Sequence, residues 1–192
     1  AAPSAPEVDV AMGNSSLLTD VGFGTVSGFS SLTELPATTK LGLRPRRSQT
    51  DLVLITVPGS VSKGAVLTVI AFGEISPLAD DKKFLSASVL DETTGALIDL
   101  PVAIGDQGPK ASLFVLHASP DAPAVDVVTS SGTKLVTSLS YKDASPTVEL
   151  AGGSYPVNVV RAGGTAKLAT LNLKLLPGLR WTLVAQGLLS GG

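Results

Sequence analysis

Few residues of this chain have the side chains that enzyme chemistry requires. His117 is the only histidine and cysteine is absent, which excludes thiolate catalysis and cysteine–zinc sites. Asp121 and Asp126 follow His117 closely, but one histidine and two carboxylates at this spacing are too few ligands for a metal centre without help. We therefore predict no catalytic, cofactor-binding or metal site and no enzymatic activity.

The segment around His117 is better explained by chain geometry. Pro120 and Pro123 fix φ and remove backbone donors, so the chain is expected to turn between two strands here. We expect Asp121 to cap this turn by accepting backbone N–H bonds, and Asp126 to face outward or to bond to the turn. His117 is interpreted as a hydrogen-bonded structural residue at a strand end.

Composition excludes two classes of partner. The net charge is −2, without the basic surface that nucleic acid requires. No apolar run approaches the ~18 residues of a membrane span. Charged residues make up only 16% of the chain, against roughly 25% in soluble domains. Either a partner covers part of the surface, or the exterior is rich in serine and threonine, as in extracellular domains.

An internal repeat decides the architecture. Residues 2–10 and residues 119–127 both read x-Pro-x-Ala-Pro-x-Val-Asp-Val. Further matches follow in the same order, and the displacement between the copies changes by only a few residues. They pair residues 23–27 with 141–145, 34–35 with 149–150, 41–43 with 157–159, and 67–73 with 181–187. The chain is therefore read as a tandem duplication.

Each copy has the pattern of short strands. Apolar residues alternate with polar ones in residues 8–10, 157–159 and 171–173, so apolar side chains share one face. Clusters of glycine, proline and small polar residues separate the runs at the spacing of a sandwich or small barrel. We predict an all-β fold of two tandem Ig-like, Greek-key β-sandwich modules.

The two copies are offset in frame. Residues 113–117 form an apolar strand before the second copy of the motif, and the first copy has no counterpart to it. The first copy continues into the apolar segment 84–90, which the second copy does not reach. We predict a first module over residues 1–92, a connector over 93–110 and a second module over 111–192, with one terminal strand missing from each module.

A sandwich without one of its strands exposes unpaired backbone groups. Three explanations remain open. The chain could be the ordered or processed part of a longer one. The connector could supply a substitute strand, for which residues 96–104 are the candidate. Another subunit could donate the strand, as in donor-strand complementation.

Residues 117–127, which read His-Ala-Ser-Pro-Asp-Ala-Pro-Ala-Val-Asp-Val, resemble the signature of domain-of-unknown-function family 4397. The resemblance continues through residues 149–159 and 182–187, and it is weaker in the first copy, where Ser4 replaces an aspartate. It implies secreted or surface-attached β-sandwich modules, often in tandem, with no established activity.

These features favour an extracellular or cell-surface structural protein that self-assembles, for example as a filament or surface-layer subunit using strand donation. The alternative is an adhesion module that binds glycan or protein through its loops. The expected partners are copies of itself or other surface proteins, and glycans under the alternative. The start of the chain reads as a mature N-terminus from which a signal segment has been removed. Asn14 begins an acceptor sequon for glycosylation.

Overall fold

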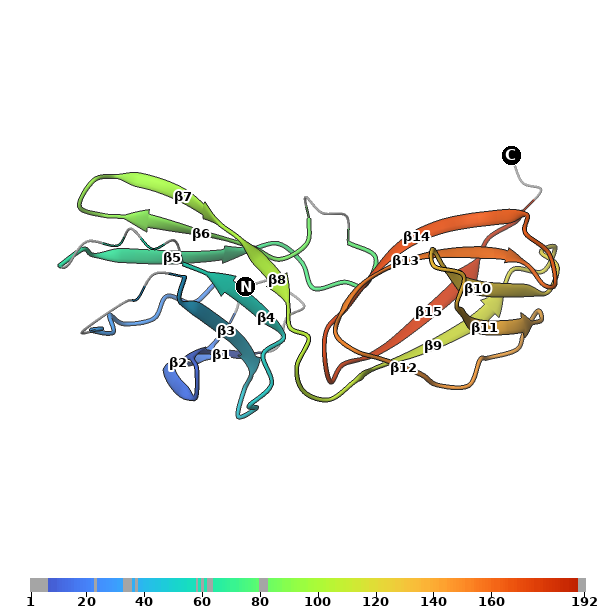
Figure 1. Cartoon of the computed structure of the whole chain (residues 1–192), viewed down its shortest axis with the longest axis horizontal. Helices are drawn as coiled ribbons and strands as arrows, with labels where there is room; N and C mark the ends of the chain where they lie inside the picture. Colours follow the sequence, from blue (N-terminus) through green and yellow to red (C-terminus); the bar gives the residue numbers. More distant parts are fainter. Residues whose placement is uncertain are drawn as a thin grey trace. The chain divides into compact units, whose positions relative to one another are not determined.

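The computed structural model describes residues 7–22, 24–32, 36, 38–57, 59, 61, 64–79 and 83–189. These residues form strands, turns and loops, which confirms the predicted all-β fold. The chain divides into two compact units, Ala1–Gly108 and Pro109–Gly192, each drawn in Figure 1. No described segment is a helix of the length and hydropathy needed to cross a membrane.

The second unit is a sandwich of two sheets. One sheet has the strand order β11-β10-β13-β14 and the other β12-β9-β15. Their inner faces share a core that includes Leu113, Val127, Val157 and Leu173. The strands are β9 (Ala111–Ala118), β10 (Val125–Thr129), β11 (Lys134–Leu139), β12 (Val148–Leu150), β13 (Gly153–Arg161), β14 (Lys167–Leu175) and β15 (Arg180–Gln186).

Strand β9 is the central element of its sheet. Its residues alternate strictly between buried and half-buried along all eight positions, as expected for a strand with one face in the core. It pairs parallel with β15, with Leu183 opposite Val115. On its other side it pairs antiparallel with β12.

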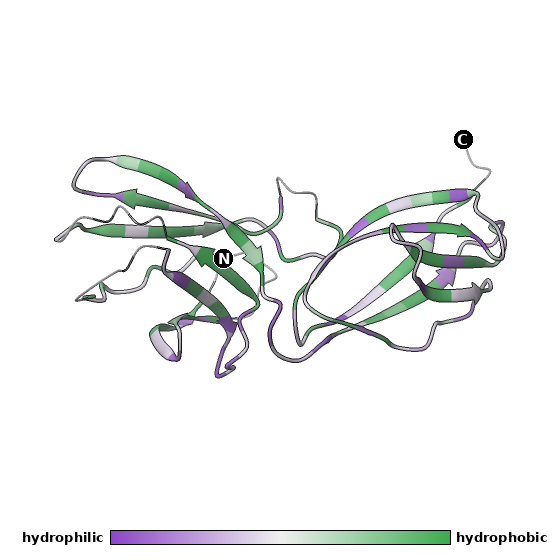
Figure 2. Cartoon of the chain, in the orientation of Figure 1, coloured by the Kyte–Doolittle hydropathy of each residue, from purple (hydrophilic) through white to green (hydrophobic). Residues whose placement is uncertain are grey.

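The first unit also has two sheets. Their strand orders are β2-β1-β3-β4-β8 and β5-β6-β7, and Figure 2 shows hydrophobic residues along β5 and β6. The strands are β1 (Val8–Met12), β2 (Ser15–Val21), β3 (Lys40–Pro45), β4 (Val53–Thr56), β5 (Leu67–Phe72), β6 (Ser86–Asp91), β7 (Ala96–Leu100) and β8 (Val102–Ile104).

The internal repeat of the sequence is also seen in how the strands pair. The order β2-β1-β3-β4 in the first unit matches β11-β10-β13-β14 in the second. Val10 of β1 lies opposite Leu43, and its counterpart Val127 of β10 lies opposite Val159. Four strands are therefore paired in the same order in both copies, and β8 is added beside β4 in the first unit.

The other sheet differs between the copies. β5 corresponds in sequence to β15, but its described neighbour is the antiparallel strand β6 rather than a parallel strand like β9. β7 adds to β6, and β8 pairs with β4. The segment named as a candidate substitute strand, residues 96–104, thus forms β7 and β8 and lies within the first unit.

Three parts of the sequence comparison lie outside the described residues. These are the first-copy motif before Glu7, residue 23, which matches 141, and residues 34–35, which match 149–150.

Candidate functional site

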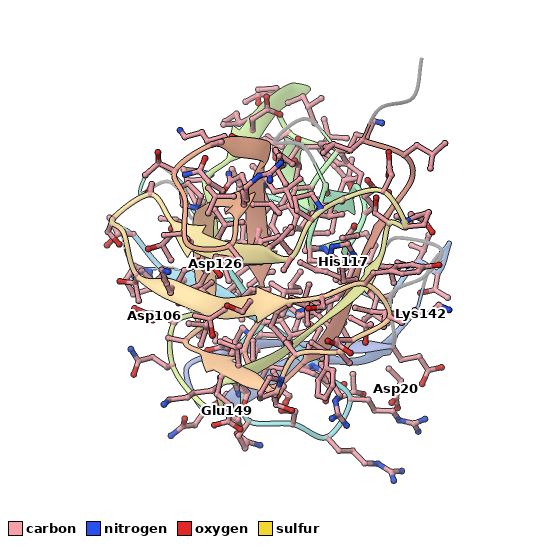
Figure 3. All side chains as sticks on the ribbon, turned by 90° about the vertical axis from the view of Figure 1, so that its right-hand side faces the viewer. Asp20, Asp106, His117, Asp126, Lys142 and Glu149 are labelled. Atoms are coloured by element: carbon pink, nitrogen blue, oxygen red, sulfur yellow. The ribbon has the colours of Figure 1, made fainter. Side chains whose placement is uncertain are left out.

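His117 is an internal structural residue of the second unit. Its side chain is 1% exposed, and Figure 3 labels it among the side chains of this unit. Nε2 lies 3.1 Å from the carbonyl oxygen of Pro123, and Nδ1 lies 3.3 Å from the backbone nitrogen of Ser119. Because Ser119 N–H can only donate, Nδ1 accepts and Nε2–H donates to Pro123. Both ring nitrogens are therefore used to hold the turn after β9.

The motif also anchors the end of β15. The Ser119 hydroxyl donates to the carbonyl oxygen of Gly187 at 2.7 Å. Asp121 Oδ1 accepts the backbone N–H of Leu189 at 3.0 Å and is 3.3 Å from the Ser119 hydroxyl. Asp121 accepts a backbone N–H, as a capping residue would, and the donor Leu189 lies in the chain after β15. This distant partner could not be predicted from local spacing.

Asp126 lies inside the second unit, although the sequence left an outward position open. The residue is 1% exposed. Oδ1 accepts the backbone N–H of Ser138 at 2.8 Å. Oδ2 accepts a hydrogen bond from the Lys134 ammonium group at 2.7 Å and a second one from the Gly163 N–H at 3.4 Å. The carboxylate therefore joins β10 to a bulge in β11 and to the turn between β13 and β14.

These bonds favour the ionised form of the carboxylate. The hydrogen bond from Lys134 is the largest cause, followed by that from the Ser138 N–H, and together they hold the pKa of Asp126 below its usual 3.8. Hydrogen bonds to the charged form lower a carboxyl pKa in this way. The Asp126 carboxylate thus has a structural role, and we call this set of hydrogen bonds from one buried carboxylate to neighbouring strands and turns the clamp.

Asp9 makes the same clamp in the first unit. Oδ1 accepts the backbone N–H of Asp20 at 3.0 Å, and Oδ2 accepts that of Arg47 at 3.1 Å. These two bonds, that of Asp20 first, lower the pKa of Asp9 from its usual 3.8. Asp20 and Arg47 both have positive φ, as do Ser138 and Gly163 in the second unit. The recurring Val-Asp-Val was the signal that could have identified this clamp.

The described residues contain no group of three or more metal-ligating side chains of His, Cys, Asp or Glu. Trp181 and Tyr155 pack against the core cluster, while Tyr141 is 42% exposed. Asn14, the sequon residue, is exposed in the turn between β1 and β2.

The first unit has exposed apolar side chains that the sequence did not indicate. Val69, Ile70 and Phe72 of β5 are 46%, 43% and 45% exposed. In the segment between β2 and β3, Val26 is 96% exposed and Phe29 is 84% exposed. Ile70 and Phe72 share one face of β5, and Val69 lies on the other. Exposed apolar surface of this kind marks interaction sites when it is contiguous. These side chains are the candidate functional surface of the described chain.

Comparisons with known proteins are consistent with the fold and name no activity. No curated protein and no solved structure matches the chain. The family model described as "Domain of unknown function (DUF4397)" matches residues 1–97 and residues 111–191. These two segments cover most of the chain, one in each unit. The chain belongs to the DUF4397 family and contains two copies of its domain in tandem.

Proposed function

We propose that this protein is a non-enzymatic structural protein of the cell surface or extracellular space, whose subunits assemble by pairing strands. The observation that carries the proposal is β5. It lies at the edge of its sheet and its six residues, Leu-Thr-Val-Ile-Ala-Phe, include no charge and no proline. Such an edge is a template for pairing with another chain.

The other sheet edges support this choice. Each of the other edge strands either contains a charged residue or is very short. Both features discourage pairing with a further strand. The edge strands β2, β7, β11, β12, β14 and β15 contain Asp20, Asp99, Lys134, Glu149, Lys167 and Arg180 respectively, and β8 has only three residues. β5 is thus the long unguarded edge among the described strands.

The alternative, a module that binds glycan or protein through loops, has less support. Glycan platforms need exposed aromatic rings, and Trp181 and Tyr155 pack against the core. Phe29 and Phe72 are exposed, but their rings carry no polar group to hydrogen-bond a sugar hydroxyl. Tyr141 is exposed, but it contacts Lys142, whose Nζ lies 5.2 Å from the ring centre. We therefore place strand pairing first.

The test is the assembly state of the purified native protein, measured by light scattering and by negative-stain imaging of the same sample. We expect filaments or large ordered oligomers. The matched variants are Ile70→Lys on β5, which should reduce assembly, and Leu97→Lys on β7, which should not. A monodisperse monomer at high concentration would overturn the proposal. Surface labelling of intact cells tests the location.

A further inference from the structure

One strand position is filled in the second unit and has no described occupant in the first. In the second unit, β9 lies between β15 and the segment that follows β11. That segment pairs with β9 through β12 and through a bridge between Leu116 and Ala144. The backbone bonds His117 N to Asp143 O and Ser145 N to Val115 O extend the pairing.

Both neighbours of this position exist in the first unit. β5 corresponds to β15, and residues 24–32, which follow β2, correspond to the segment that follows β11. The alignment is supported by the backbone, because Gly24 and Lys142 occupy matched positions with φ of 71° and 72°. Val26 is then the counterpart of Ala144.

β6 does not occupy this position. Only Pro101 separates β7 from β8, and β8 pairs with β4 at one edge of the larger sheet. β6 and β7 therefore extend from β5 toward that edge. Residues 24–32 lie at the opposite edge, since the Ser30 hydroxyl donates to the carbonyl oxygen of Leu17 in β2. In the view of Figure 1, β6 and the segment after β2 lie on opposite sides of β5.

Side-chain burial agrees with an open strand position. Leu18 and Val21 of β2 are only half-buried, whereas their counterparts Val136 and Leu139 of β11 are each 5% exposed. Val69 of β5 is 46% exposed, whereas its counterpart Leu183 is half-buried. The first unit thus exposes apolar side chains at the place that β9 covers in the second.

We infer that this position, between β5 and residues 24–32 and here called the acceptor position, binds one extended segment that lies outside the described residues of this chain. The segment runs parallel to β5 and antiparallel to residues 24–32, as β9 does between its neighbours. Its inward side chains are apolar at alternate positions, in the pattern of Leu113 and Val115. No charge opposes it, because β5 and residues 24–32 are both uncharged.

This inference deepens the proposed function and rests on it for the source of the strand, which is a neighbouring subunit of the assembly. Backbone hydrogen bonds to an added strand supply affinity, and alternate side chains in the core supply specificity. The second unit has its own β9 in this position, so the acceptor position belongs to the first unit.

A register-specific disulfide tests the geometry. The probe is a synthetic peptide of residues 109–120, the β9 sequence, carrying Leu116→Cys, and the protein carries Val26→Cys. The chain has no other cysteine, and Val26 is exposed enough for the variant to fold. Residues opposite one another on paired strands lie within disulfide range. The protein is dissociated before the reaction, so that no neighbouring subunit occupies the acceptor position. We expect rapid cross-linking of this pair.

Two controls define the register. Peptide with Ser112→Cys places its thiol four residues out of register, and protein with Leu97→Cys places an exposed thiol on β7. We expect at least a tenfold slower reaction in each case. Equal rates for all pairs, or no reaction of the matched pair, would overturn the inference. Hydrogen exchange gives a second reading without substitutions, in which excess peptide should protect β5 and residues 24–32.

The outcomes separate this inference from the proposed function. If the matched disulfide forms while the native protein is a monomer, the acceptor position stands and assembly fails. If the native protein assembles while the matched disulfide does not form, assembly stands and the acceptor position is wrong.

Discussion

The side chain of Asp126 holds the backbone of Ser138 in a left-handed conformation, by accepting its N–H at 2.8 Å where φ is 50°. Asp9 holds Asp20 in the same way in the first unit, at 3.0 Å where φ is 58°. A non-glycine residue at positive φ is strained, so the carboxylate stabilises a bulge that the backbone alone would avoid.

We predict that Asp126→Asn lowers the melting temperature of the second unit at neutral pH. The neutral amide loses the ionic bond to Lys134. Its NH₂ group also replaces one of the two carboxylate oxygens, so a donor faces backbone N–H or ammonium groups that are themselves donors. Asp143→Asn is the matched control, because the Asp143 side chain is exposed. Calorimetry measures both variants, and equal melting temperatures for the two would contradict the clamp.

The same clamp predicts a pH dependence. The pKa of Asp126 is lowered on folding, so its stabilisation is complete above the usual value of 3.8 and is lost as pH falls through the folded pKa. The difference in melting temperature between the wild type and Asp126→Asn should therefore shrink below about pH 4. A difference that stays constant down to pH 2 would contradict this assignment.

His117→Ala should destabilise the second unit by about 1–3 kcal/mol, since it leaves the Ser119 N–H and the Pro123 carbonyl without their partner. Chemical denaturation measures this loss. His117→Gln, which keeps a donor and an acceptor, should recover part of it. A structural histidine leaves assembly under native conditions intact, so loss of assembly without loss of stability would refute this role.

Leu113→Ala should lower the free energy of unfolding by about 2–5 kcal/mol, because Leu113 of β9 is fully buried in the core and its truncation leaves a cavity. Leu97→Ala, at a site 62% exposed on β7, should change stability by less than ~0.5 kcal/mol. The comparison, made by urea denaturation, tests whether β9 is the core strand of its unit.

Substitution of two glycines of the first unit by alanine should destabilise the unit for two different reasons. A Cβ on Gly42 would lie 1.9 Å from Asp51 Oδ1, and a Cβ on Gly105 would lie 2.0 Å from the Asp51 carbonyl oxygen. Both Gly→Ala variants should be destabilised by overpacking. Asp51→Ala should reduce the loss of stability caused by Gly42→Ala, because the atom that the new Cβ meets belongs to the Asp51 side chain. It should not reduce the loss caused by Gly105→Ala, because the atom met there is the Asp51 backbone carbonyl oxygen. Thermal melts of the double variants measure this coupling.

The sequence predicted the all-β class and the tandem copies because both depend on local alternation and on the repeat. It also pointed to the turn at Pro120 and Pro123. It left the position of Asp126 open, because the donors of the clamp, Ser138 and Gly163, come from other strands and turns. Burial of such a carboxylate depends on pairing that the motif does not contain.

The acceptor position could be predicted only in part. The repeat predicted that β5 corresponds to β15, but not whether residues 96–104 would occupy the position beside β5 that β9 occupies beside β15. The structure adds β7 and β8 on the β4 side instead. This outcome depends on the short link at Pro101 and on pairing with β4, which are tertiary features.

Hydrogen exchange of the native assembly tests the central claim most directly, when compared with the same protein after dissociation. We predict that β5 and residues 24–32 are protected in the assembly and exchange rapidly in the dissociated chain, while β9 is protected in both. A native protein that is a monomer, or an assembly in which β5 and residues 24–32 exchange as fast as in the dissociated chain, would contradict it.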